Sequence, residues 1–193
     1  DCSIVGNVFN EVSCLQQSYA QSNSLTKCGV CNILDFGVME SEYWIVMECG
    51  ERNVREWRKE CFIDEELNMC QYWVCMLLLR EISVIIRDVH AAGIVHFDIK
   101  CDNFILRQTP DFDCLFEAYR EGKLSGTVFL TDFGEAVSLT TMEMYSRGAK
   151  NSPNDSMLLE KCKGTLAIQS PEMICLSEMK TKKSGSGDPG AEE

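Results

Sequence analysis

Two short runs, each joining an apolar stretch to closely spaced polar residues, constrain the fold more than any other feature of the sequence. The first run, VHFDIKCDNFIL (95–106), contains Asp98, Lys100 and Asn103 and ends in an apolar stretch. The second run, LTDFGEA (130–136), places Asp132 in an Asp-Phe-Gly triplet directly after an apolar, strand-like stretch. We therefore expect the polar residues of the two runs to form one site.

The residue types in these runs suit phosphoryl transfer. A hydroxyl that attacks a γ-phosphate needs a carboxylate to orient it and accept its proton, a cation near the transferring group, and oxygen ligands for magnesium. Asp98 and Lys100 suit the first two roles. Asn103 and Asp132 suit the third, because Mg²⁺ prefers carboxylate and amide oxygens. These four residues are the candidate catalytic and metal-binding residues, and ATP and Mg²⁺ are the expected cofactors.

With these motifs the chain resembles the eukaryotic protein kinase family, whose catalytic loop reads H-R-D-x-K-x-x-N and whose metal-binding loop reads D-F-G. A third run, KGTLAIQSPEM, places Thr165 and Glu172 at the spacing of the family's G-T and A-P-E motifs. The resemblance implies that Thr165 bonds Asp98 and Lys100. It also implies that Glu172 pairs with a downstream arginine, and no arginine follows Glu172 in this sequence.

The resemblance implies a bilobal α+β fold and divides the chain accordingly. Residues 1–47 would form the end of the small lobe, 48–50 the hinge between the lobes, and 51–179 the first half of the mainly helical large lobe. Residues 180–193 form a polar, flexible linker by composition. The implied activity is transfer of the ATP γ-phosphate to a protein substrate. The pairing of Lys100 with a Gly-Thr motif favours serine or threonine as the acceptor.

The adenine site is also implied by the resemblance. The β-branched, alternating run over 42–47 predicts a strand that leads into the hinge. Met47 would then be the gatekeeper, and backbone atoms of Glu48 and Gly50 would face adenine. Ile105 would cap the ring from the large lobe, although a strand-core role explains an apolar residue at this position equally well.

Two helices are predicted from apolar spacing. The pattern over 8–17 predicts an amphipathic helix carrying Glu11, which by resemblance would pair with an ATP-binding lysine. The alternative for Glu11 is an ordinary surface glutamate. A second helical pattern extends over 63–92, and Gly93 supplies its stop signal.

A second Asp-Phe-Gly begins at Asp35, within an expected strand over 31–40. It precedes Asp98, whereas the metal-binding triplet of the family follows the catalytic aspartate, so we exclude it.

Several parts of the family pattern are missing. No G-x-G-x-x-G loop precedes Glu11, and no lysine occurs before Lys27. The large-lobe helices expected after the third motif are also absent. We therefore expect a fragment of a longer protein, with weak or no activity on its own, in preference to a lineage that lost its phosphate loop.

Phe97 stands where the family usually has arginine, which makes this a non-RD sequence. That arginine meets a phosphate on the activation loop in the usual arrangement. Phenylalanine cannot form this contact. We therefore do not expect activation through a loop phosphate that is read at this position.

Composition excludes some partners. The net charge of −12 argues against nucleic acid and anionic membranes, and the uncharged run over 67–79 is too short to span a bilayer. The 12 cysteines lie mostly in apolar runs, which indicates a reducing compartment and hence a cytoplasmic protein. The Cys-x-x-Cys over 28–31 lacks a second pair, so a turn before a strand is favoured over zinc.

Two other classes of protein compete with an active kinase. A pseudokinase that acts as a binding or scaffold module would explain the missing lysine and phosphate loop, but not the retention of all four candidate residues. A small-molecule phosphotransferase shares Asp98 and Asn103 but not Lys100 or the third motif. A P-loop NTPase is excluded for this chain, because no G-x-x-x-x-G-K-[ST] occurs.

Overall fold

The described part of the chain is an α+β fold in which helices pack around short strands. The computed structural model describes residues 2–21, 29–40, 42–61, 69–107, 117, 120–121, 126–139, 165, 167, 169–171 and 174. Its helices are α1 (Cys2–Gln21), α2 (Val54–Cys61) and α3 (Met69–Ala91), with 3₁₀ turns η1 (Cys101–Asn103) and η2 (Phe133–Glu135). Its strands are β1 (Ile33–Met39), β2 (Glu42–Met47), β3 (Arg52–Asn53), β4 (Ile94–Val95), β5 (Phe104–Leu106), β6 (Val128–Leu130) and β7 (Val137–Ser138).

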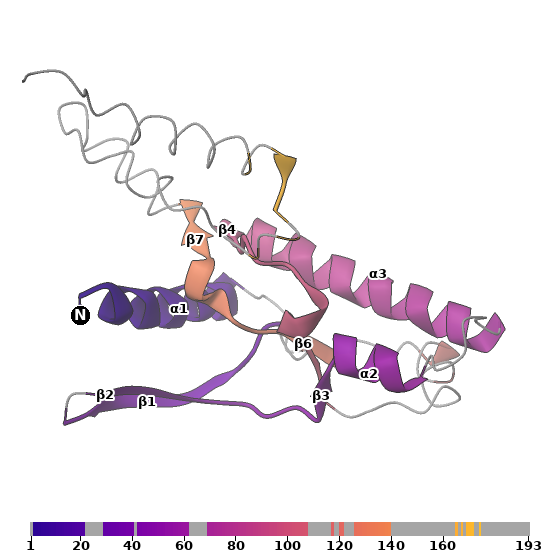
Figure 1. The fold of residues 1–193 in the computed structure, drawn as a ribbon, viewed down its shortest axis with the longest axis horizontal. Coiled ribbons are helices and arrows are strands. Elements are labelled where there is room, and N and C mark those ends of the chain that lie inside the picture. Colours follow the sequence, from indigo (N-terminus) through magenta and orange to yellow (C-terminus); the bar gives the residue numbers. More distant parts are fainter. Residues whose placement is uncertain are drawn as a thin grey trace, which may run out of the picture.

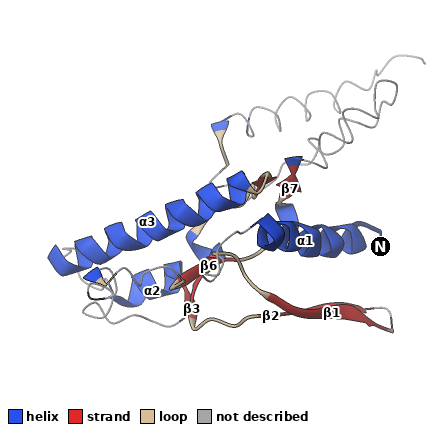
Figure 2. Cartoon of the chain, turned by 180° about the vertical axis from the view of Figure 1, so that it is seen from behind, coloured by secondary structure: helices blue, strands red, loops and turns tan. Residues whose placement is uncertain are grey.

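The strands form three small antiparallel groups. β1 and β2 make a hairpin, β5 lies between β3 and β6, and β4 pairs with β7. Figure 1 shows α1 lying along the β1–β2 hairpin on one side of the molecule, with α2 and α3 on the other. The view from behind in Figure 2 shows the same division, with the short strands between the two halves.

One parallel bridge joins the chain before the hairpin to the central strands. Val30 pairs with Leu130 of β6, supported by bonds from Cys31 N to Leu130 O (2.8 Å) and from Leu130 N to Gly29 O (2.9 Å). The hairpin is thereby attached to the strand that precedes the second Asp-Phe-Gly.

The core is continuous across the molecule. Buried apolar residues from α1, α2, α3 and the central strands form one cluster, which includes Leu15, Trp57, Val74, Leu130 and Phe133. Burial of this apolar surface is the main stabilising contribution to such a fold. The cluster includes Phe104 and Phe133, one from each polar motif, and so holds both motifs against the core.

The predicted elements compare well with these. A helix spans the predicted segment over 8–17, and strands occupy the expected positions before and after residue 41. The described part of the second predicted helix is α3, Met69–Ala91, and the predicted start at residue 63 lies outside the described residues. Gly93 follows α3 with a positive φ of 72°, as expected of a glycine at a helix stop.

Helix α2 was not predicted, although the sequence carries its signal. The N–H of Glu56 donates to Asn53 Oδ1 (2.8 Å), and the N–H of Asn53 donates to Glu56 Oε2 (3.2 Å). This reciprocal pair is a capping box, which satisfies two of the free N–H groups at a helix start. Trp57, 2% exposed, anchors the helix in the core.

A bilayer-spanning helix, of sufficient length and apolar character, is not found among the described residues.

Candidate active site

The loop that carries Asp98 is supported by a buried histidine, His96. The ring nitrogen Nδ1 of His96 accepts from the N–H of Asp98 (3.2 Å), and Nε2 faces Thr131 O at 3.1 Å. Because a backbone N–H can only donate, the ring proton is on Nε2. Burial lowers the pKa of His96, although the bond to Thr131 opposes this shift. The ring also packs edge-on against Phe133, with centroids 4.7 Å apart, so His96 joins the two motif loops.

Asp98 is 5% exposed and lies at the centre of a hydrogen-bond network. Its Oδ1 accepts from the N–H (2.8 Å) and the hydroxyl (2.7 Å) of Thr165. Its Oδ2 accepts from Lys100 Nζ (2.6 Å) and from Asn103 Nδ2 (3.2 Å). Lys100 also donates to the Thr165 hydroxyl (2.8 Å), which closes the network.

This network controls the charge of Asp98. Burial by itself raises the pKa of the carboxyl, but the hydrogen bonds from Lys100, Thr165 and Asn103 outweigh burial and lower the pKa to about 2. The bond to Asp98 in turn raises the pKa of Lys100. The pair is therefore fully ionised near neutral pH, with a carboxylate able to orient a hydroxyl and a cation beside it.

Asn103 and Asp132 offer the oxygens that magnesium prefers. The amide nitrogen of Asn103 donates to Asp98 O (2.9 Å) and to the Asp98 carboxylate, which leaves its amide oxygen for other ligands. Thr131 N donates to Asn103 O (2.9 Å) and brings the two loops together. Asp132 is exposed and has a left-handed backbone (φ 63°). Mg²⁺ commonly takes only one or two protein carboxylates and completes its shell with phosphate oxygens and water, so these residues fit it.

Glu11 of α1 reaches the loop that carries Asp132 and Phe133. Its Oε1 accepts from the N–H of Phe133 (3.3 Å), and the neighbouring Asn10 donates to Ala136 O (2.8 Å). Burial raises the pKa of Glu11; the bond from Phe133 opposes this shift, and the charge of Asp132 adds to it. Among the described residues Glu11 has no ion pair, and Lys27 lies outside them.

The four residues expected at the adenine site also lie close together. Gly50 approaches β5 so closely that a Cβ atom built on it would lie 2.3 Å from Ile105 Cγ2 and 2.6 Å from Leu106 O. Met47 ends β2 and is partly buried, and Glu48 follows it with its N–H bonded to Asn32 O (2.8 Å). Only glycine fits at residue 50 without a shift of the backbone.

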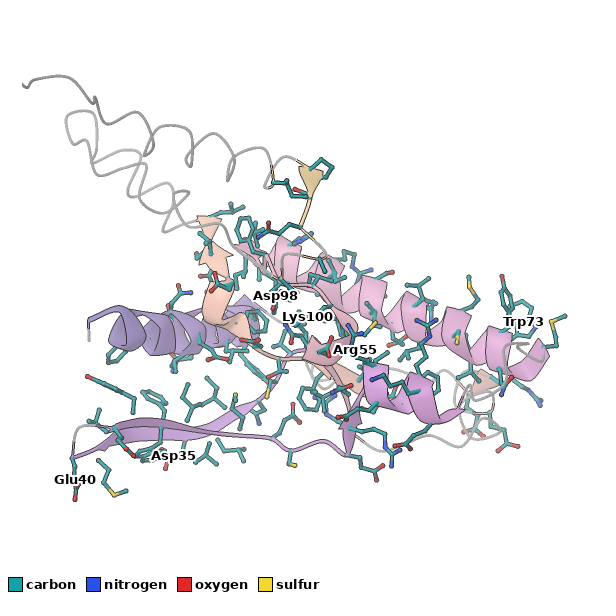
Figure 3. The ribbon with its side chains drawn as sticks, in the orientation of Figure 1. Asp35, Glu40, Arg55, Trp73, Asp98 and Lys100 are labelled. Atoms are coloured by element: carbon teal, nitrogen blue, oxygen red, sulfur yellow. The ribbon has the colours of Figure 1, made fainter. Side chains whose placement is uncertain are left out.

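Of the other positions singled out from the sequence, some lie outside the described residues and others lie away from the site. Glu172 lies outside the described residues, as does Cys28 of the Cys-x-x-Cys, whereas Cys31 is a buried free thiol. Asp35, of the excluded Asp-Phe-Gly, lies in β1 and accepts from Phe36 N (2.9 Å). Figure 3 shows Asp35 on the hairpin, away from Asp98 and Lys100 in the middle of the molecule.

Two arginines beside the site escaped prediction. Arg55 of α2 holds Asp102, next to Asn103, through bonds from Nε to both carboxylate oxygens (2.8 and 2.9 Å); Figure 3 labels it near Lys100. Arg107 binds Glu48 across 59 positions of sequence. Nothing in the spacing of these residues indicates either pair. The one available signal is the capping box of α2, which places Arg55 in the first turn of a helix.

Comparisons with known proteins find similarity between this chain and several protein kinases. No protein-family model matches the chain. It is 27% identical over 184 residues to a probable serine/threonine-protein kinase of Dictyostelium discoideum, covering 92% of the chain and 6% of that protein. It is 23% identical over 192 residues to the dual specificity protein kinase Ttk of Danio rerio, covering 99% of the chain and 15% of the relative.

A third relative, the serine/threonine-protein kinase MPS1 of Saccharomyces cerevisiae, is 25% identical over 128 residues, which is 65% of the chain and 14% of that protein. These similarities extend over most of the chain and support a kinase-like family. The chain spans a small fraction of the length of each relative.

Proposed function

We propose that this chain is the central part of a protein kinase catalytic domain, which in its full-length protein transfers the γ-phosphate of ATP to serine or threonine hydroxyls of a protein. The observation that carries the proposal is the network on Asp98, in which one buried carboxylate accepts from Lys100, Asn103 and Thr165. The names of the relatives support the same class of enzyme. Within this proposal residues 1–47 end the small lobe, 48–50 form the hinge and 51–179 begin the large lobe.

Each residue has a distinct role in the proposed reaction. Asp98 orients the acceptor hydroxyl and takes its proton as the phosphoryl group transfers. Lys100 steadies the negative charge of that group, and Thr165 holds the carboxylate and the ammonium in place. Mg²⁺, held by Asn103 and Asp132, would neutralise charge on the phosphates. The hinge backbone and Ile105 would bind adenine.

The low pKa of Asp98 makes proton acceptance the smaller part of its proposed role. A carboxylate with a pKa of about 2 is a weak base. Its main contribution is therefore orientation of the hydroxyl, and positioning accounts for much of the catalysis in phosphoryl transfer.

A pseudokinase that binds partners without catalysis is the alternative. The observation in its favour is that Glu11 has no ion pair among the described residues, although a kinase uses this glutamate to hold a lysine on ATP. Against it stands the order of the site. A binding module gains nothing from an ionised Asp98 in contact with Lys100 and Asn103.

The test is transfer of labelled γ-phosphate by the full-length protein to a generic Ser/Thr substrate in the presence of Mg²⁺. Asp98→Asn should lower the rate by about 10²- to 10⁴-fold, because the variant loses the carboxylate that orients the acceptor hydroxyl and takes its proton. Transfer that survives this substitution, or no transfer by a well-folded wild-type protein, would contradict the proposal.

The chain provides a matched control, because it contains two Asp-Phe-Gly triplets. Asp132→Asn should raise the Mg²⁺ concentration needed for half-maximal rate. Asp35→Asn makes the same chemical change in the other Asp-Phe-Gly triplet, on the β1–β2 hairpin, and should leave both rate and Mg²⁺ dependence unchanged. Equal effects of the two substitutions would remove the metal role from Asp132.

A further inference from the structure

An ion pair between Arg107 and Glu48 connects the hinge to the central strands. Arg107 follows β5, and Glu48 follows β2. The guanidinium donates from Nη2 to Glu48 Oε1 (2.7 Å) and from Nε to Oε2 (3.1 Å). The two side chains are only 13% and 22% exposed. A two-point arginine–carboxylate pair with this little exposure is both stronger and more directional than a surface ion pair.

The rest of the guanidinium is engaged as well. Nη1 of Arg107 donates to Gly126 O (2.9 Å) and lies 3.4 Å from Val128 O, and the guanidinium carbon lies 4.7 Å from the centre of the Phe129 ring. Arg107 is thus fixed on the β5–β6 pair by contacts that do not involve Glu48. It acts as a rigid support to which the hinge is attached.

Glu48 is likewise fixed on both sides. Its Oε1 accepts from Asn32 N (3.0 Å), and its own N–H donates to Asn32 O (2.8 Å). Within the part of the chain that the structure describes, its carbonyl has only a long contact from the Cys31 thiol (3.9 Å). The side chain and the N–H of Glu48 are therefore engaged within the protein, whereas its carbonyl can accept a stronger donor.

The hinge has a second fixed point two residues later. Gly50 lies against Ile105 and the carbonyl of Leu106, and Glu51 N donates to Leu106 O (2.9 Å). The backbone from Glu48 to Gly50 is therefore held at one end by Arg107 and at the other by β5. This is the stretch assigned above to adenine.

We propose that Arg107 is a positioning residue for the nucleotide: through its ion pair with Glu48 it sets the hinge backbone that recognises the adenine edge, without touching the nucleotide itself. This inference rests on the proposed function. It predicts an effect on ATP binding and little effect on the chemical step, because the Asp98 network shares no residue with this pair.

The diagnostic variant is Arg107→Lys in the full-length protein. Lysine keeps the charge but cannot bond both carboxylate oxygens and the Gly126 carbonyl in a fixed plane. We expect the KM for ATP to rise about tenfold, the effect of losing one charged hydrogen bond, with kcat changed by less than about twofold. The Kd of a fluorescent, ribose-labelled ATP analogue should rise in parallel.

Two further variants separate positioning from general stability. Glu48→Gln should also raise the KM for ATP. The double variant Glu48→Gln with Arg107→Lys should have a KM no higher than that of the more damaging single variant, because both substitutions act on one contact.

The matched control is Arg87→Lys, since Arg87 forms an exposed ion pair with Asp88 on α3. It should leave the KM for ATP unchanged.

The outcomes are distinct. An unchanged KM in a folded Arg107→Lys protein overturns the inference, even if its melting temperature and kcat are lower. An equal rise of KM in Arg87→Lys also overturns it. In each of these cases the proposed kinase function stands. Failure of the wild-type protein to bind the ATP analogue or to transfer phosphate would instead remove the proposed function, and this inference with it.

Discussion

Three of the four candidate residues that the sequence brings forward, Asp98, Lys100 and Asn103, meet at the carboxylate of Asp98. Asp98 accepts four hydrogen bonds, about as many as its two oxygens can accept. A substrate hydroxyl must therefore displace or share one of them, and the two donors from Thr165 are on the same oxygen, Oδ1. Asp98, Lys100 and Asn103 lie within six residues of one another on one loop, so their closeness follows from the sequence. Thr165 lies 67 positions away, and only the family resemblance placed it at Asp98.

The depressed pKa of Asp98 predicts a defined acid sensitivity. Because the pKa falls from 3.8 to about 2 on folding, ionised Asp98 stabilises the native state above pH 3.8, and this contribution disappears as the pH falls through about 2. It amounts to about 2 kcal/mol for a group this buried. Unfolding in denaturant at several pH values should show wild type more stable than Asp98→Asn at neutral pH, with the difference shrinking below pH 3.8. A difference independent of pH would contradict this.

Elements that depend on local pattern were predicted better than those that depend on pairing. The apolar periodicity over 8–17 and 63–92 indicated helices, and α1 and α3 are there. Strands β3 and β4 have two residues each, too short for any periodic signal, and they exist because β5 and β7 supply partners. The ion pair of Arg107 with Glu48 escaped prediction for the same reason, since nothing local indicates it.

Helix α2 depends on its capping box, and this gives a prediction at the scale of one element. Asn53→Ala should lower the local stability of α2 by about 1 kcal/mol, the usual cost of losing an N-cap. Hydrogen exchange of the amides in 54–60 should accelerate accordingly. Asn53→Ser keeps a side-chain oxygen that can accept from Glu56 N, and it should restore slow exchange. Fast exchange in both variants would show that the cap is not what holds the helix start.

At the scale of the molecule, α1 joins the regions on either side of the candidate site. Asn10 bonds Ala136 O (2.8 Å), Gln17 bonds Ala92 O (2.8 Å) and Tyr19 bonds Val30 O (3.1 Å), three carbonyls far apart in sequence. A helical pattern indicates which face of α1 is apolar but not which elements it meets. This arrangement therefore could not be derived from periodicity alone.

Because the core is a single cluster, damage to α1 should spread. Leu15 is completely buried within it, and Leu15→Ala should cost about 2–5 kcal/mol through lost burial and a cavity. We expect hydrogen exchange to accelerate in α1 and also in β6 and α3, which share this core. Leu79→Ala makes the same change at a residue of α3 that is 55% exposed, and should alter exchange little. Acceleration confined to α1 would mean that α1 opens separately, and the loop that carries Asp132 would then depend on a helix that moves independently of the core.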